Sequence, residues 1–171
     1  MRRTFRSWMV RIICCSFVVG LGVVTWNVRH DVSHAEPVET VSIAQDLDVP
    51  TSDITCLAQA LYFEAATESL KGMQAVASVV FNRAASPGYP ETLCEVVYQR
   101  GQFSWTTNPQ KRRRSPSVRY MQLAVDMIKN RGILQEQYPV THFHHVSVSP
   151  RWSRRLAYFT TIGSHRFYGQ P

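Results

Sequence analysis

The sequence has 171 residues, of which 44% are hydrophobic and 18% charged, and its formal net charge is +7. This composition excludes a disordered chain, and the length is enough for one domain with its own core. The positive charge predicts attraction to a polyanion such as nucleic acid, anionic lipid or an acidic polymer, but charge alone does not choose among them.

The first 35 residues have the pattern of an export signal. Three arginines among the first six residues precede an almost entirely apolar stretch over 12–26, and small residues at 33 and 35 suit a signal peptidase. A cleaved signal peptide is favoured over a retained membrane anchor, because the apolar run is shorter than the about 20 residues of a full span. Either alternative predicts an exported domain in the periplasm or cell envelope, possible membrane association, and a linker over 36–50.

The domain is expected over 51–171, and its first part is predicted to be helical. Thr51 to Asp53 are N-cap residue types, and apolar residues then recur at helical spacing up to Ala65. A break at Glu68-Ser69 leads to a second amphipathic stretch, which Ser86-Pro87-Gly88 should end. A short third helix is expected from Pro90 to Val97.

Residues 101–114 are expected to form a polar loop before a fourth helix. Ser115-Pro116 should cap and open that helix, which runs to about Asn130, with Gly132 as its C-terminal cap. Its apolar stripe would consist of Val118, Met121, Val125 and Ile128.

The last part of the chain has the composition of strands. Residues 140–148 are rich in β-branched and aromatic residues, and the stretches 158–162 and 165–168 flank Gly163-Ser164 as in a hairpin. Helices followed by a small antiparallel sheet predict an α+β domain.

Two cysteines, Cys56 and Cys94, remain once the signal is removed. In an exported domain such a pair can form a disulfide, although two buried free thiols are the alternative.

Glu64 is the most informative residue in the sequence. It follows Leu57 by seven positions and Leu61 by three, which places it on the apolar face of the first helix. Burial of a carboxyl group raises its pKa, and a carboxyl that stays protonated can act as a general acid. The alternative is a buried structural glutamate held by an arginine, for which Arg83 is a candidate, or by backbone amides. Glu68, one turn further, is interpreted as a solvated residue.

Short motifs along the chain resemble the SleB/CwlJ-type cell wall hydrolases. They lie in the family's order, from Cys56 to Tyr168: Ala60-Leu61-Tyr62-Phe63-Glu64-Ala65 with Glu68, Gly72 to Ala77, Val80 to Arg83, Ser86-Pro87, Val96 to Gln99, Gln102-Phe103-Ser104-Trp105, Thr141 to His144, Pro150-Arg151-Trp152, and Ile162-Gly163 with His165 and Phe167-Tyr168. The resemblance implies a helix-rich, lysozyme-like fold with one essential glutamate, which falls on Glu64. In place of a cysteine pair common among relatives, this chain has Gly101 and Thr107.

The implied reaction is cleavage of peptidoglycan glycan strands between N-acetylmuramic acid and N-acetylglucosamine. Glycosidases usually use two carboxylates. With a single one, Glu64, the sequence favours the lytic transglycosylase route. A non-catalytic peptidoglycan-binding or scaffold protein and a metal-dependent amidase are the alternatives.

Several polar and aromatic residues are candidates for substrate contact because they can hydrogen-bond a sugar or stack on its ring: Tyr62, Gln102, Ser104, Trp105, His142 and His144. For Trp105, packing with Phe103 inside the loop is the alternative. His142 and His144 share one face of a strand, but no third ligand is evident, so neither a metal nor another cofactor is expected. Residues 111–114, Lys-Arg-Arg-Arg, are interpreted as a solvated loop that could also steer substrate. No nucleic-acid-binding motif accompanies the charge, and a monomer is expected.

Overall fold

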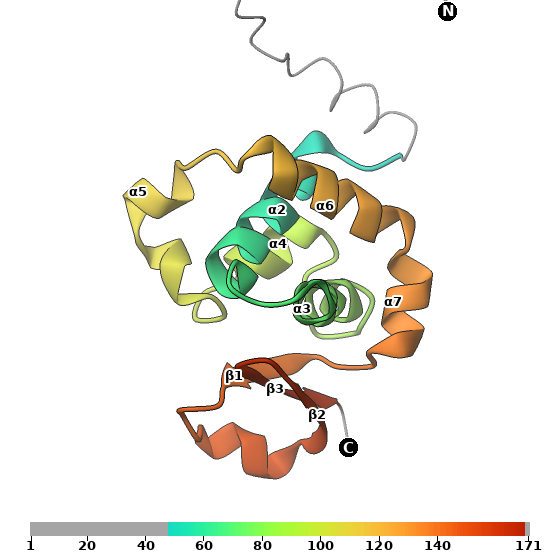
Figure 1. Ribbon diagram of the computed structural model, residues 1–171, viewed down its shortest axis with the longest axis vertical. Coiled ribbons are helices and arrows are strands. Elements are labelled where there is room, and N and C mark those ends of the chain that lie inside the picture. Colours follow the sequence, from blue (N-terminus) through green and yellow to red (C-terminus); the bar gives the residue numbers. More distant parts are fainter. Residues whose placement is uncertain (1–47, 170–171) are drawn as a thin grey trace, which may run out of the picture. The chain divides into compact units, whose positions relative to one another are not determined.

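Helices and a small sheet divide the domain between them in the computed structural model, which describes residues 48–169, all within one compact unit (Figure 1). The helices are α2 (Thr51–Ala65), α3 (Leu70–Ala84), α4 (Leu93–Tyr98), α5 (Pro109–Arg112), α6 (Val118–Lys129) and α7 (Arg131–Gln137), with 3-10 turns η1 (Ser104–Thr107) and η2 (Arg151–Arg155). The strands are β1 (His142–His145), β2 (Ala157–Ile162) and β3 (His165–Gly169). The expected α+β class is confirmed.

The predicted signal or anchor and most of the predicted linker lie outside the described residues, and both stay predictions. Among residues 48–169, no helix combines the length and the apolar character that a membrane crossing requires.

Helix α2 is the central element, with α3, α4 and α6 packed around it (Figure 1). Its buried side chains include Ile54, Leu57 and Leu61, all fully inaccessible to solvent. The expected N-cap at residues 51–53 is wrong, because the cap is Pro50 and these residues already form the first turn. Asp53 instead accepts hydrogen bonds from the backbone N–H groups of Leu93 and Cys94, at 3.2 and 3.0 Å, at the start of α4.

The predicted boundaries of the later helices also need correction. Helix α4 begins after Pro90, because Thr92 and Glu95 form a capping box. Helix α6 begins after Ser117, and Val118 is 75% exposed and does not belong to its buried stripe. Gly132 is not a cap but lies within α7. The breaks between α2 and α3 and after α3 lie where they were predicted.

The segment 101–114 is not an irregular polar loop. It contains η1 and α5, and Phe103 and Trp105 within it are only 2% and 3% exposed. The two apolar side chains draw the segment into the core while its charged residues stay outside. This part of the fold therefore packs against the end of α2 that carries Glu64, since Trp105 stacks on Phe63.

The sheet has the strand order β1-β3-β2, and both pairs are antiparallel. It lies between α3 on one side and η2 on the other (Figure 1). Asn82 and Arg83 of α3 hold the segment that leads into β1, because they donate hydrogen bonds to the carbonyls of Tyr138, Val140 and Thr141. The predicted hairpin around Gly163-Ser164 is present, whereas β1 is shorter than the stretch 140–148.

A disulfide joins Cys56 of α2 to Cys94 of α4, with 5.1 Å between the Cα atoms. The disulfide lies close to the hydrogen bonds from the start of α4 to the Asp53 carboxylate. A covalent bond and a buried carboxylate therefore both hold α4 against α2.

Removal of this disulfide should lower the stability of the domain. The bond closes a loop over a sequence separation of 38, so the double variant Cys56→Ala/Cys94→Ala should lose roughly 3–4 kcal/mol of unfolding free energy in the chain-entropy account. Urea denaturation followed by circular dichroism measures the loss. Reductant should destabilise the wild type similarly and leave the double variant unchanged, and equal midpoints for wild type and variant would contradict the expectation.

Candidate active site

The Glu64 carboxyl lies near the C-terminal end of α2, with aromatic residues close by. The preceding residue, Phe63, stacks on Trp105 with 4.6 Å between ring centroids, and Tyr62 meets Phe63 edge to face at 4.9 Å. Burial raises the pKa of Glu64 above its usual value, while the indole N–H of Trp105 and the ammonium of Lys111 offset only part of this rise. Glu64 is therefore disposed to keep its proton.

Arg83, the partner suggested for a purely structural Glu64, makes its contacts elsewhere. Arg83 donates from Nε to the carbonyl of Thr141 at 2.7 Å, and its guanidinium lies over the ring of Tyr89. Among residues 48–169, no cation lies within ion-pair distance of the Glu64 carboxylate. Glu64 thus combines a desolvated position with the absence, in this part of the chain, of a charge partner that would hold it ionised.

The Trp105 side chain is buried in the core and does not present its ring to solvent. Its ring is 3% exposed and packs against both Phe63 and Tyr98, so stacking of a sugar on this ring is not supported. The expected alternative, a segment packed by Phe103 and Trp105, describes what is observed. Nε1 of Trp105 is buried and makes no regular hydrogen bond within residues 48–169. It remains a donor available near the Glu64 carboxyl.

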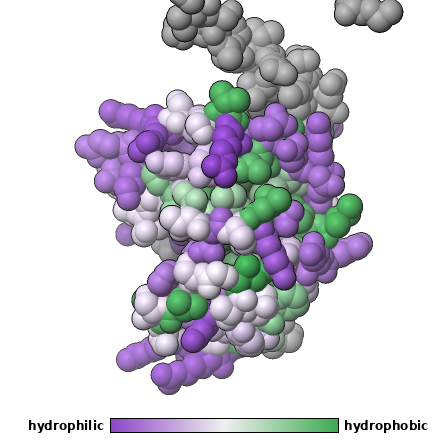
Figure 2. Space-filling view, viewed as in Figure 1, coloured by the Kyte–Doolittle hydropathy of each residue, from purple (hydrophilic) through white to green (hydrophobic). Residues whose placement is uncertain are grey.

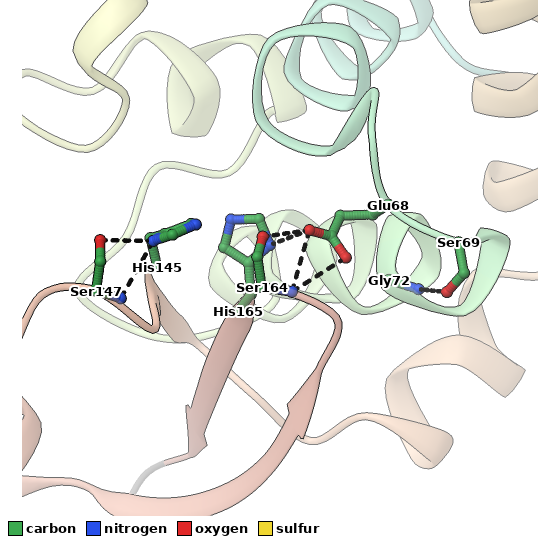
Figure 3. Close-up of polar contacts among 7 residues, drawn as sticks. All are labelled: Glu68, Ser69, Gly72, His145, Ser147, Ser164 and His165. Atoms are coloured by element: carbon green, nitrogen blue, oxygen red, sulfur yellow. Dashed lines mark hydrogen bonds and ion pairs between the residues drawn. The ribbon is translucent and has the colours of Figure 1, made fainter.

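Glu68 is not the solvated residue that its position suggested. Its side chain is 6% exposed, and it clasps the turn of the β2–β3 hairpin (Figure 3). The hydroxyl and backbone N–H of Ser164 both donate to its carboxylate, and Nδ1 of His165 lies 3.5 Å away. Burial acts to raise the pKa of Glu68, but the bonds from Ser164 and the charges of His165 and His145 outweigh it, so the pKa is lowered.

Two glycines leave space for the Glu68 side chain at its contact with the hairpin turn. Gly163 has a φ of +56°, a conformation that favours glycine, and a Cβ there would collide with the Glu68 carboxylate. A Cβ on Gly72 of α3 would come within 2.9 Å of the Cβ of Glu68. The hairpin turn and α3 therefore both approach Glu68 more closely than a larger residue would allow.

The structure brings together only part of the predicted substrate-binding set. Tyr62 lines a hollow of about 140 Å³ together with Phe63 and Arg114. Gln102 and Ser104 are exposed on the segment that carries Trp105. Trp105 stacks on Phe63, so this segment packs against the end of α2 that carries Glu64. Contact of Tyr62, Gln102 and Ser104 with substrate stays a prediction.

His142 and His144 lie elsewhere. They pair with Tyr168 and Arg166 on the face of the sheet turned away from Phe143, and both pack against Trp152 of η2. Nε2 of His144 contacts the hydroxyl of Tyr168 at 2.9 Å. No described contact joins either histidine to Glu64 or Trp105, so the geometry does not gather them with the other predicted residues. In residues 48–169, no group of three or more His, Cys, Asp or Glu side chains is arranged to hold a metal.

Comparison with known proteins identifies the family. The profile of the cell wall hydrolases matches residues 67–168. The chain belongs to the cell wall hydrolase family. The family resemblance drawn from the sequence motifs is thereby confirmed, although the match begins three residues after Glu64 and leaves the role of that residue a prediction.

Two solved structures share the fold of this cell wall hydrolase. One is the catalytic domain of the Bacillus cereus SleB protein, at 23% identity and a TM-score of 0.59, covering 70% of this chain and 91% of that one. The other is the catalytic domain of the germination-specific lytic transglycosylase SleB from Bacillus anthracis, at 23% identity and a TM-score of 0.60, covering 70% and 95%. No curated protein sequence matches the chain significantly.

Sequence reasoning missed the residues that position the site from a distance. Gln59 is buried on α2, and its side chain holds the backbone of residues 112 and 114. A glutamine between two alanines of an apolar helix was a usable signal, because a buried amide must find partners. The Ser164 contact to Glu68 had no comparable local signal.

The close fit around Glu68 makes Gly163 sensitive to substitution. Gly163→Ala should destabilise the domain by about 1–3 kcal/mol, because it combines a strained φ with a clash against the carboxylate. Gly132→Ala is the matched control, since it lies in α7 with nothing within 4 Å, and it should be neutral or stabilising by up to about 1 kcal/mol. Urea denaturation measures both. In a Glu68→Ala background the cost of Gly163→Ala should shrink, and an unchanged cost would show that the carboxylate is not the obstacle.

Removal of the positive charge of Lys111 should change the pKa of Glu64 measurably. Lys111→Gln removes a cation that lowers the pKa of Glu64, so the pKa should rise further in this variant, while Lys111→Arg should leave it near the wild-type value. A pH titration of the Glu64 carboxyl carbon by NMR tests this. Lys129→Gln carries the same charge change on α6 and should have no effect. An unmoved pKa in Lys111→Gln would show that the basic segment does not reach the carboxyl.

Proposed function

We propose that this domain cleaves the glycan strands of peptidoglycan between N-acetylmuramic acid and N-acetylglucosamine, and that it does so as a lytic transglycosylase. Membership of the cell wall hydrolase family supports the substrate class. The observation that carries the mechanism is the raised pKa of one half-buried carboxyl group, Glu64, which has no charge partner in ion-pair distance among residues 48–169.

In the proposed reaction, protonated Glu64 donates its proton to the glycosidic oxygen as the bond from that oxygen to C1 of muramic acid breaks. The resulting carboxylate accepts the proton of the muramic C6 hydroxyl, and O6 bonds to C1. The product has a 1,6-anhydro end, Glu64 regains its proton, and no water is consumed. Activity should fall as the pH rises through the raised pKa of Glu64, because the acid form is then lost.

The state of Glu68 supports this route over hydrolysis. A glycoside hydrolase usually uses a second carboxylate to activate water or to attack the sugar. Glu68 is the nearest acidic residue along the chain, but its carboxylate is occupied by Ser164 and lies near His165. Asp53 is likewise occupied by the start of α4. The intramolecular hydroxyl makes such a second group unnecessary.

We also propose that the reaction takes place outside the cytoplasm. Peptidoglycan lies there, the first 35 residues have the pattern of an export signal, and a disulfide between Cys56 and Cys94 persists in an oxidising compartment.

Glu64→Gln should reduce the release of products from purified sacculi by about a thousandfold or more, because an amide cannot donate the proton. Mass spectrometry of the soluble fragments provides the measurement. Glu136→Gln, the same change on the exposed surface of α7, should retain wild-type activity. The fold of each variant is checked by circular dichroism.

The fragments also discriminate among mechanisms. Anhydro-muramic ends are expected. Reducing ends would replace the transglycosylase by a hydrolase, free peptides would indicate an amidase, and no soluble product from the wild type would indicate a binding protein. Full activity in Glu64→Gln would end the proposal.

A further inference from the structure

Residues 111–114, the basic segment, form a concentrated positive surface that the proposed reaction does not use. The segment consists of Lys111 and three arginines at the end of α5 and just after it, and all four side chains are exposed. Hydrophilic side chains gather over this part of the molecule (Figure 2). Within residues 48–169, none of the four cations has a carboxylate within 4 Å.

A buried side chain fixes the backbone of the basic segment. Gln59 of α2 is 5% exposed, and its Nε2 donates to the carbonyls of Arg112 and Arg114 at 3.1 and 2.9 Å. Its Oε1 accepts from the hydroxyl of Tyr98 at 2.6 Å. An ordinary solvated run of charges needs no such anchor. The anchor belongs to the same helix as Glu64, so the position of the cations relative to the acid is set by α2.

Aromatic rings next to the site position the cationic side chains. Lys111 Nζ lies 5.8 Å from the ring centroid of Phe63, and Arg114 Cζ lies 4.9 Å from that of Tyr62. Both rings directly precede Glu64 in the sequence. The effect of Lys111 on the Glu64 carboxyl agrees with this closeness. The basic segment therefore borders the catalytic end of α2.

The surface is also hollowed where the cations lie. A hollow of about 430 Å³ is lined by Tyr98, Pro109, Arg112 and Arg113, and Arg112 Cζ stands 5.0 Å from the ring centroid of Tyr98. Two guanidinium groups beside an aromatic wall suit a carboxylate on a short flexible chain, because guanidinium binds carboxylate through paired hydrogen bonds.

We propose that the basic segment is a subsite for the carboxylates of the peptides attached to muramic acid, so that the enzyme prefers glycan that carries peptides over bare glycan. This inference rests on the proposed function. Where a peptide is attached, the lactyl carboxyl of muramic acid is bound in an amide, so the sugars next to the cleaved bond carry no charge, whereas the peptides carry carboxylates away from the sugar ring. A cationic surface held beside Glu64 would therefore select for the peptide and steer the strand by charge.

The test compares two substrates and two variants of the full chain. The substrates are peptide-bearing glycan strands and the same strands after removal of the peptides by an amidase. The amidase leaves a free lactyl carboxylate on each muramic acid, so the two substrates differ in whether a carboxylate is carried on a peptide away from the sugar ring. Arg112→Gln/Arg113→Gln neutralises the hollow and leaves Lys111 in place. Arg154→Gln/Arg155→Gln is the matched control, because it makes the same charge change in η2, on the opposite side of the sheet from α3 (Figure 1).

The wild type should have a higher kcat/KM on peptide-bearing strands, and the ratio between the two substrates should fall about fivefold in Arg112→Gln/Arg113→Gln. The control pair should keep the wild-type ratio. Higher salt should lower the ratio in the wild type, since exposed charges are screened. An unchanged ratio, or an equal fall in both variants, would overturn the proposal.

Binding separates this inference from the proposed function. If the wild type releases no product from either substrate, the proposed function fails. The subsite is then tested by the affinity of the Glu64→Gln protein for the two kinds of strand, where a preference for peptide-bearing strands that Arg112→Gln/Arg113→Gln removes would sustain it.

Binding to vesicles of phosphatidylglycerol and phosphatidylcholine tests whether the basic segment binds lipid instead of peptide. Loss of vesicle binding in Arg112→Gln/Arg113→Gln, together with an unchanged substrate ratio, would show that the segment contacts lipid and would overturn the peptide subsite.

Discussion

The burial of α2 is the constraint on which the rest of the domain depends. A helix enclosed on most sides must satisfy each polar side chain that it carries, because an unpaired buried group is costly. Asp53 meets this requirement through the start of α4, and Gln59 meets it through Tyr98 and the basic segment. At Glu64, burial outweighs the hydrogen bond of Trp105 and the charge of Lys111, so the pKa of its carboxyl is raised. The least satisfied acid on the central helix is thus the one suited to chemistry.

The same constraint explains how distant parts of the chain are placed around Glu64. Asp53 positions α4, Gln59 positions the basic segment, and Glu68, just beyond the end of α2, positions the hairpin turn at Ser164. Each contact joins α2 or its end to a segment far along the sequence. The three contacts hold α4, the basic segment and the hairpin turn against α2 and the residues that follow it. Glu64 lies between Gln59 and Glu68 along this part of the chain.

The helical phase and the hairpin could be predicted because both depend on local spacing. That phase placed Glu64 on the apolar face of α2, and Gly163-Ser164 marked the turn between β2 and β3. Glu68 was misjudged because its partner Ser164 lies 96 residues away, and helical spacing describes only neighbours on the same helix. The segment 101–114 was misjudged because its many charges hid the burial of Trp105, which tertiary packing decides.

A cation beside a general acid normally works against it, because the positive charge favours the carboxylate. Lys111 has this effect on Glu64, but burial is the larger influence, and the pKa stays raised. Solvent explains the balance, since the exposed cations of the basic segment are screened by water and salt while the desolvation of the carboxyl is not. A positive surface can therefore lie next to the acid and attract an anionic substrate without removing the proton on which the proposed reaction depends.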